Sequence, residues 1–277
     1  MKSTFRLNEI FRVDKPIIGM VHLRPLPGSA GYRSGSGMKT IVNEGLEDAS
    51  RLIEGGVDGI QTENQGDWPF QPPEEIGPET VAAVTAAVSR IRDRFDVPMG
   101  INIHLNGVCQ ALAIAVATEC QWVRAFELAN AYVAPSGIIN AAGPRALRYR
   151  CFLRAEEKVM ILGDYHVKHG SHQLVADKSR AELAHDAETS LADAIIITGR
   201  ETGSAPDADE ISTIRKAVSV PLLIGSGLGK DNIKELLTIV DGAIVGSAFK
   251  IDGRLESPVD VKLVKDFMKA VAAVREK

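Results

Sequence analysis

Two short apolar runs near the end of the chain break into glycine and serine. The first spans 221–227 and ends in Gly-Ser-Gly, and the second spans 241–248 and contains Gly-Ser. Backbone N–H groups beside glycine can approach an anion closely, because no Cβ stands in the way. In an eight-fold βα barrel, a phosphate commonly lies at the loops after strands seven and eight. The pattern therefore predicts that a phosphate is bound by Gly225, Ser226, Gly227, Gly246 and Ser247.

Carboxylates and imidazoles stand where other apolar runs end. Glu63 closes one such run, and an unpaired carboxylate buried there would be costly, which favours a role as a base or a hydrogen-bonding anchor. The densest ionisable run is 164–169, Asp-Tyr-His-Val-Lys-His. A carboxylate near an imidazole suits proton transfer near neutral pH, and a desolvated lysine can form a Schiff base. We predict Glu63 or Asp164 as base, His22 or His166 as acid, and Lys168 as an alternative nucleophile.

Further polar residues near strand ends are predicted to contact a substrate. They are Asn102, His104, Glu127, Thr198 and Thr202. Asn102, His104 and Asn106 alternate, so along a strand they would face the same way. Some of these candidates have a structural alternative. His22 could be a core histidine, and Glu127 could form an ion pair with Arg124 or another barrel residue. Asn106 is better explained as the cap of a helix that begins near Val108.

Metal binding is a weaker interpretation of the same residues. Asp164 with His166 could hold a divalent metal, but the spacings H-x-H and H-E-x-x-H are both absent from the sequence. No cofactor is therefore predicted, and a divalent metal stays an open alternative.

The elements that must position these residues follow from the pattern of apolar runs. Nearly continuous apolar character is typical of parallel strands covered on both faces, and amphipathic segments between them indicate helices. The predicted strands are 17–23, 59–63, 99–105, 122–128, 159–164, 194–198, 221–225 and 242–246. The predicted helices are 38–55, 79–95, 108–117, 144–158, 177–190, 208–218, 231–239 and 259–274.

Eight strands alternating with eight helices predict a single (βα)8 TIM barrel over residues 1–277. Residues 1–16 would lead into it, and residues 257–277 would contain the closing helix. A doubly wound open sheet would need a G-x-G-x-x-G turn after its first strand, where this chain reads His22-Leu-Arg-Pro-Leu-Pro-Gly28. Two long connections, 24–37 and 130–143, follow strands and would be either lids or solvated loops.

Composition limits the expected cellular compartment and the expected classes of binding partner. The 277 residues are 45 % hydrophobic and 25 % charged, and the net charge of −4 argues against a general nucleic-acid binder. Three scattered cysteines, Cys109, Cys120 and Cys151, predict neither disulfides nor a structural zinc site. With no signal peptide and no membrane-spanning run, we expect a soluble cytoplasmic protein without a membrane partner, and a homo-oligomer as the default assembly.

Several motifs together resemble the BtpA family. They are 22–28, 57–64 with Gly66-Asp67, 106–115, 167–169, 193–199 with Thr202-Gly203, 225–227, and 245–250 with Asp252-Gly253. The resemblance implies a TIM-type barrel grouped with phosphate-binding barrels. The family takes its name from a factor needed for photosystem I biogenesis, and it includes SgcQ-like proteins of bacterial sugar-utilisation regions. This chain has His104 where members often carry arginine, and Asn106-Gly107 where they often carry Asn-Asp, which could mark a different substrate specificity.

Three functions remain in competition at this point. The first is an enzyme that isomerises a small phosphorylated sugar or nucleotide-like substrate, cleaves a carbon–carbon bond in it, or cleaves its glycosidic bond. The second, which the family name suggests, is a biogenesis or assembly factor without catalysis. The third is a metal-dependent hydrolase. Because the unusual residues of this chain gather at the predicted barrel mouth, the first is favoured.

Overall fold

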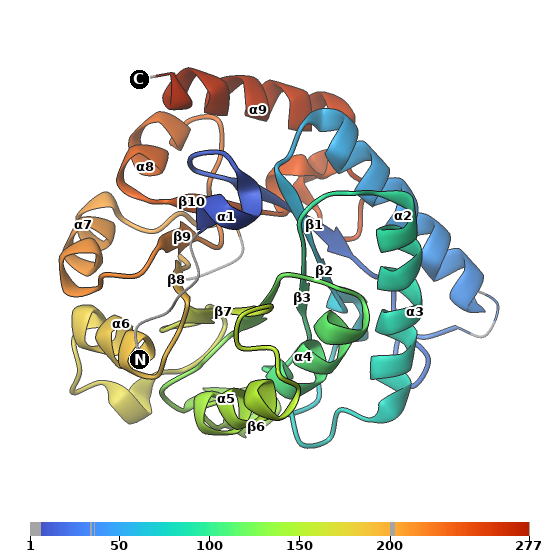
Figure 1. Ribbon diagram of the computed structural model, residues 1–277, viewed down its shortest axis with the longest axis horizontal. Coiled ribbons are helices and arrows are strands. Elements are labelled where there is room, and N and C mark those ends of the chain that lie inside the picture. The colour runs from blue at the N-terminus through green and yellow to red at the C-terminus, as the bar shows by residue number, and fades with distance from the viewer. Residues whose placement is uncertain (1–6, 34, 36, 200–202, 277) are drawn as a thin grey trace.

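Eight parallel strands close into a barrel that a ring of helices surrounds (Figure 1). The computed structural model describes residues 7–33, 35, 37–199 and 203–276. Around the barrel, the strands follow the order β1-β10-β9-β8-β7-β4-β3-β2, which confirms the predicted fold class. Their bounds are β1 Ile17–His22, β2 Gly59–Glu63, β3 Met99–Asn102, β4 Trp122–Ala125, β7 Met160–Asp164, β8 Ala194–Ile197, β9 Leu222–Ile224 and β10 Gly242–Val245.

The helices cover the outer face of the barrel, where the outward side chains of the strands form the larger hydrophobic core. Ile17 and Val21 of β1, for example, are buried in it. The surrounding helices are α2 Gly37–Gly55, α3 Pro78–Arg94, α4 Val108–Ala117, α5 Gly143–Phe152, α6 Arg180–Thr189, α7 Ala208–Ala217, α8 Ile233–Ile239 and α9 Val261–Arg275. Short 3-10 turns follow some strands: η1 Gln65–Asp67, η2 Gln173–Val175, η3 Ser247–Phe249 and η4 Ile251–Gly253.

In several strands the inward side chains change from apolar to polar along the chain. Successive residues of a strand point to opposite faces, so every second residue enters the barrel. In β1 the inward series is Ile18, Met20, His22, and in β7 it is Met160, Leu162, Asp164. Apolar residues therefore fill one end of the barrel, and the charged residues are positioned at the carboxyl ends of the strands.

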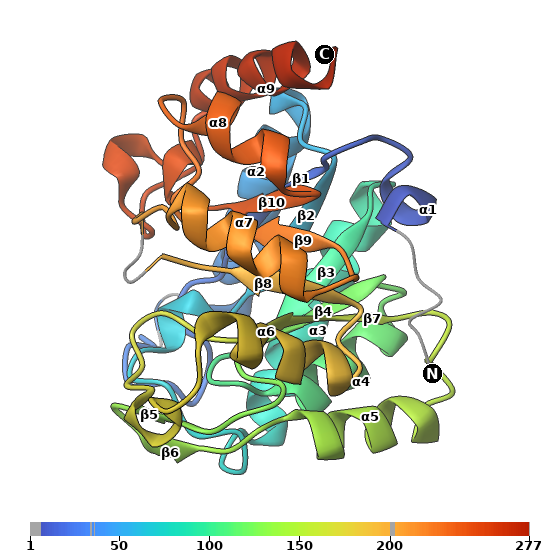
Figure 2. The same cartoon turned by 90° about the vertical axis from the view of Figure 1, so that its left-hand side faces the viewer.

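A short N-terminal helix closes the apolar end. In α1 (Leu7–Phe11), Leu7 and Phe11 pack into the inner core, and the Phe11 ring lies 5.3 Å from that of Trp122 on β4. Figure 2 shows α1 on the opposite side of the barrel from the antiparallel hairpin of β5 (Tyr132–Ala134) and β6 (Gly137–Ile139). Residues 7–11 of the predicted lead-in thus form the floor of the barrel.

The structure corrects several predicted boundaries. β3 ends at Asn102 and not at residue 105, and β4 ends at Ala125 and not at residue 128. The chain leaves β3 early because the Asn64 side chain accepts a hydrogen bond from the His104 amide at 2.8 Å, and Asn106 takes a left-handed φ of 58°. Asn102, His104 and Asn106 consequently do not share one strand face. The loop 130–143 contains the unpredicted hairpin β5–β6, and α5 ends at Phe152.

Gly100 on β3 provides a test of the packing in the barrel floor. A Cβ at this position would lie 1.9 Å from the Trp122 Nε1 atom, and the Trp122 ring is buried. We expect Gly100→Ala to lower the free energy of unfolding by about 1–3 kcal/mol in urea denaturation, because overpacking forces neighbouring atoms to shift.

Gly229 is the matched control, since a Cβ there meets nothing within 4 Å. Gly229→Ala should leave stability unchanged or raise it slightly, by restricting the unfolded chain. Equal stability of the two variants would contradict the packing described for Trp122.

Candidate active site at the carboxyl ends of the strands

A cavity of about 620 Å³ opens at the carboxyl ends of the barrel strands. This is the end at which the reacting groups of βα barrels lie. Both predicted phosphate-binding segments, Gly225-Ser226-Gly227 after β9 and Gly246-Ser247 after β10, line this one cavity. The ionisable side chains at its wall are His22, Glu63, His104, Arg124, Lys168 and His169.

Glu63 lies between two imidazoles. Its Oε1 atom is 3.3 Å from His22 Nε2 and 3.5 Å from His104 Nε2, while its Oε2 atom accepts a hydrogen bond from Asn102 Nδ2 at 2.8 Å. The strand register produces this row, because His22 pairs with Glu63 and Glu63 pairs with Asn102 across β1, β2 and β3. All three side chains therefore enter the barrel at the same level.

The surroundings of Glu63 keep its carboxylate ionised. Burial by itself raises the pKa of Glu63, but the charge and hydrogen bonds of His104 and His22 outweigh it and hold that pKa well below its ordinary value. An ionised carboxylate in contact with two imidazoles can orient them and stabilise their protonated forms. The cluster His22–Glu63–His104 can thus move protons at the cavity wall.

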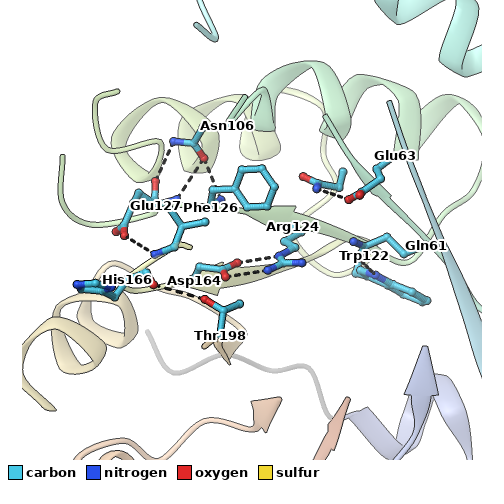
Figure 3. A network of polar contacts seen from close by, with 12 residues as sticks. Gln61, Glu63, Asn106, Trp122, Arg124, Phe126, Glu127, Asp164, His166 and Thr198 are labelled. Carbon is cyan, nitrogen blue, oxygen red and sulfur yellow. Dashed lines mark hydrogen bonds and ion pairs between the residues drawn. The ribbon is translucent and has the colours of Figure 1, made fainter. Parts of the chain in front are cut away.

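Asp164, a predicted base, is instead held in a buried ion pair. Both of its oxygens accept hydrogen bonds from Arg124, from Nε and Nη2, each at 2.8 Å, and Figure 3 shows the two side chains facing one another. Burial raises the pKa of Asp164, and the guanidinium opposes that rise. Bidentate pairing satisfies a buried carboxylate but leaves it poorly placed to take a proton from a ligand. Arg124, not Asp164, is the member of the pair that lines the cavity.

Lys168 enters the cavity from the loop after β7. Among the described residues, no hydrogen-bond or ion-pair partner of its ammonium group is found. Burial, together with the nearby Arg124 guanidinium, lowers the pKa of Lys168 to about 8, although the charges of Glu63 and Asp164 partly offset the shift. At neutral pH, Lys168 is thus a cation that can attract an anion, and slightly above neutral pH it gains a nucleophilic amine.

The glycines of the first predicted phosphate-binding segment allow neighbouring groups to pack closely against its backbone. A Cβ on Gly225 would lie 2.4 Å from Ile196 and 3.0 Å from Arg124 Nη2, so this glycine lets the guanidinium come close to the segment. Gly227 has a φ of +78°, and a Cβ there would lie 2.2 Å from the backbone of Ser204 and Ala205. The loops after β8 and β9 are therefore in direct backbone contact.

The second segment approaches the acid–base cluster. A Cβ on Gly246 would lie 3.3 Å from the His22 ring, so glycine here leaves room for the imidazole. Gly246 leads directly into the single 3-10 turn η3. The Ser226 hydroxyl accepts a hydrogen bond from the Gly203 amide at 3.3 Å. Both segments line the cavity together with the cationic side chains of Lys168 and Arg124.

Besides Asp164, four predicted site residues lie outside the cavity wall. Asn102 is buried behind Glu63, and Thr198 donates to the His166 carbonyl at 3.4 Å. The His166 ring stacks on His172 with centroids 3.6 Å apart and lines a separate outer pocket beside α6. Neither His166 nor Asp164 therefore lines the central cavity. Glu127 is fully buried and accepts a hydrogen bond from the Val167 amide at 3.2 Å. Thr202 lies outside the described residues.

Asn106 links two loops and does not cap a helix. Its Nδ2 donates to the carbonyls of Glu127 and Asn140 at 3.1 and 3.3 Å, and its Oδ1 accepts from the Phe126 amide at 3.0 Å (Figure 3). The N-cap of α4 is Gly107, without a side-chain cap. The cap predicted for Asn106 was therefore wrong. Arg124 pairs with Asp164 and not with Glu127, whose Oε1 atom instead lies 3.6 Å from His172 Nδ1.

Sequence reasoning missed the aromatic side of the cavity. Trp68, Phe70, Phe126 and Tyr132 line it together with His104. The sequence did contain a signal, since Trp68-Pro-Phe70 follows the second strand at a predicted catalytic end. Arg124 was considered only as a partner for Glu127, although an arginine inside a buried strand is itself unusual.

The described residues contain neither a metal-ligand cluster nor a membrane-crossing helix. Residues 7–33, 35, 37–199 and 203–276 contain no group of three or more His, Cys, Asp or Glu side chains arranged to hold a metal ion. Within the same residues, no helix combines the length and the apolar character that a membrane crossing requires.

The fold and the cavity define this chain as a (βα)8 barrel with a cavity of charged and aromatic side chains at the carboxyl ends of its strands. The sequence places it further: residues 13–273 match the model of the BtpA family, and the chain belongs to that family. It is 35 % identical to the photosystem I biogenesis protein BtpA of Synechocystis sp., over 96 % of this chain and 91 % of the relative. An uncharacterized protein of Thermococcus kodakarensis is also 35 % identical, over 95 % and 97 % of the two chains.

Solved structures with the same fold are distant in sequence. A tryptophan synthase structure from Mycobacterium tuberculosis superposes with a TM-score of 0.60 at 15 % identity, covering 95 % of this chain and 93 % of that one. N-(5'-phosphoribosyl)anthranilate isomerase from Pyrococcus furiosus gives 0.56 at 14 % identity, covering 94 % and 100 %. At such identities the likeness establishes the barrel fold alone.

The lowered pKa of Lys168 predicts how fast its amine reacts with a labelling reagent. Because its pKa is lowered to about 8, whereas an ordinary lysine titrates near ~10.4, its amine should be labelled selectively by trinitrobenzenesulfonate, with a half-maximal rate near pH 8. Peptide mapping by mass spectrometry would measure the rate at each pH.

The control is Lys168→Met, in which the fast-labelled peptide should disappear and the remaining lysines should label as before. Labelling of the Lys168 peptide no faster than the average lysine between pH 7 and 9 would contradict the assigned environment.

Proposed function

We propose that this protein is an enzyme that acts on a small phosphorylated substrate by proton transfer, as an isomerase or a lyase. The single observation that carries the proposal is that two glycine–serine segments and the His22–Glu63–His104 cluster line the same cavity. A cavity of this volume is within the usual range for small-molecule sites.

In this proposal the phosphate is bound by the backbone and hydroxyl groups of the segments after β9 and β10. Lys168 and Arg124 supply positive charge at the same cavity, and Arg124 keeps N–H groups free of its bond to Asp164 because a guanidinium carries five. Anchoring a remote phosphate positions the reacting carbon over the barrel and lowers the entropic part of the barrier.

Proton transfer falls to the imidazoles in this scheme. His22 lies beside both Glu63 and Gly246, and so between the anion site and the carboxylate. We assign His22 as the acid or base that exchanges a proton with the substrate, and Glu63 as the anion that orients it and stabilises its protonated form. His104 shares the same carboxylate oxygen and could serve the second proton transfer that an isomerisation needs.

Lys168 allows an alternative mechanism with a covalent intermediate. Its lowered pKa allows the neutral amine to attack a substrate carbonyl, with loss of water to give a Schiff base that would accept electrons in carbon–carbon cleavage. The choice between isomerisation and cleavage depends on whether this imine forms.

A second candidate rests on the name of one relative. The Synechocystis protein, 35 % identical to this chain, is called a photosystem I biogenesis protein, and an assembly role without catalysis would follow if that description extended here. Such a role gives no reason for an ionised carboxylate held between two imidazoles in a cavity. Thermal unfolding with sugar phosphates, nucleotides or divalent metals separates the candidates, because a bound ligand raises the midpoint.

Ser226→Asp tests the anion site. An added carboxylate in the segment after β9 should repel a phosphate, so the rise in unfolding midpoint produced by phosphorylated ligands should be lost while the midpoint of the free protein stays close to that of the parent. Differential scanning fluorimetry with ribose 5-phosphate measures both.

Ser136→Asp is the matched control, because Ser136 lines the same cavity from the β5–β6 turn and receives the same charge. It should reduce the ligand-induced rise much less. Ligand binding that survives Ser226→Asp would show that the phosphate is bound elsewhere.

Glu63→Gln tests the acid–base centre. The amide keeps the size of the side chain but removes the charge that stabilises a protonated imidazole, so turnover should fall by about 10²–10⁴-fold while phosphate binding persists. A screen of sugar phosphates and nucleotides by NMR would first identify the converted compound, and the variant would then be assayed on it.

The contrary outcomes are equally clear. Full turnover by the Glu63→Gln variant would remove this residue from the mechanism. Loss of turnover on adding EDTA, restored by a divalent metal, would favour the metal-dependent hydrolase instead.

A further inference from the structure

An aromatic wall, made of Trp68, Phe70, His104 and Phe126, forms one side of the cavity. The Phe70 ring stacks on His104 with centroids 4.1 Å apart and planes 10° apart. Trp68 meets Phe70 edge-on at 5.2 Å, and Phe126 lies 4.8 Å from His104. The rings therefore form a continuous aromatic surface that carries the imidazole of the acid–base cluster.

The aromatic wall extends around the barrel from the strands opposite the anion site to β2, which is three positions from β9 and two from β10. Trp68 and Phe70 follow β2, His104 follows β3 and Phe126 follows β4. In the closed order of eight strands, β3 is four positions from β9 and β4 is four positions from β10. An eight-stranded barrel is wide enough to admit one small ligand. A molecule anchored at the glycine–serine segments and extending across the cavity would meet these rings.

Trp68 at the outer end of the wall is both exposed and firmly held. Its relative exposure is 58 %, the kind of exposed aromatic surface that marks a binding site when it borders a cavity. The loop that carries it is fixed at both ends: Asp67 accepts a hydrogen bond from the Leu26 amide at 2.8 Å, and the Leu105 amide donates to the Gln71 carbonyl at 3.2 Å. A ring presented on a fixed loop can stack on a ligand at little cost in conformational entropy.

Tyr132 adds a polar group beside the aromatic wall. It lines the cavity from β5, its side chain is 1 % exposed, and its hydroxyl has no hydrogen-bond partner among the described residues. A buried hydroxyl without a partner is costly, so a ligand atom that accepts its hydrogen bond would be favoured. Ring nitrogens and exocyclic oxygens of a heteroaromatic group are such atoms.

From these observations we infer that the substrate is a ribose 5-phosphate that carries an aromatic base, a nucleotide-like molecule. The inference rests on the proposed function, because it uses the phosphate anchor to set the position of the ring. The base stacks on Trp68 and Phe70, the Tyr132 hydroxyl donates to a base atom, and the ribose lies over His22, Glu63 and Lys168. The bond between ribose and base is thereby placed at the acid–base cluster.

Isothermal titration compares uridine 5′-monophosphate and adenosine 5′-monophosphate with ribose 5-phosphate, which has the same anion and no ring. We expect at least one nucleotide to bind about tenfold or more tightly than ribose 5-phosphate, in line with stacking energies of ~1–3 kcal/mol per base. Binding should also quench tryptophan fluorescence, since of the two tryptophans Trp122 is buried in the barrel floor and only Trp68 is at the cavity.

Substitutions distinguish the contribution of the aromatic wall from that of the phosphate site. Trp68→Leu with Phe70→Leu should abolish the preference for nucleotides and leave ribose 5-phosphate affinity unchanged, and Tyr132→Phe should weaken only the nucleotide. Phe152→Leu, on an exposed ring of α5, is the control and should change neither.

The two proposals fail differently. If ribose 5-phosphate binds as tightly as the nucleotides, or if the Trp68 and Phe70 replacements weaken both ligands equally, the aromatic inference is wrong and the anion site stands. If no phosphorylated compound binds, the proposed function itself is wrong.

Discussion

The buried pair of Arg124 and Asp164 is the interaction on which the rest of the site depends. In a closed barrel every second strand residue points inward, so polar residues at strand ends leave water and need partners. Bidentate pairing meets that need, with Nε and Nη2 each 2.8 Å from the carboxylate. The paired guanidinium forms part of the cavity wall, approaches Gly225, and contributes to the lowered pKa of Lys168. The first glycine–serine segment and the Lys168 amine are thus organised around one ion pair.

Much of this architecture could be predicted from the sequence. Continuous apolar runs identify strands that are covered on both faces, and a run that ends in glycine or in a carboxylate marks the end at which a site forms. For that reason the sequence predicts that Glu63, Lys168 and the two glycine–serine segments lie at one end of the barrel, and all of them line the same cavity. What a strand end contacts is a different matter. Asp164 and Arg124 are forty positions apart, and no local pattern shows that one neutralises the other.

Local turns set the remaining differences. β3 stops short because a side chain from the previous strand's loop, Asn64, captures the His104 amide, and this separates His104 from Asn102. Because of this turn, the His104 imidazole contacts Glu63 from the loop after β3 and stacks on Phe70. Periodicity predicts which residues share a face only while the strand lasts. Beyond the end of the strand, hydrogen bonds between loops determine the direction in which a side chain points. Asn106 is a second example, because its side chain is held by the backbone of Phe126 and Glu127.

The contact between the loops after β8 and β9 has a consequence for how such a barrel can diversify. Gly227 and Gly199 both lie against the backbone of Ser204, too closely for any side chain to intervene. Neither loop can therefore gain or lose a residue alone without shifting its neighbour, and Ser226 with it. Changes in the length of these two loops should therefore occur together, and the rim that they form should keep a constant shape.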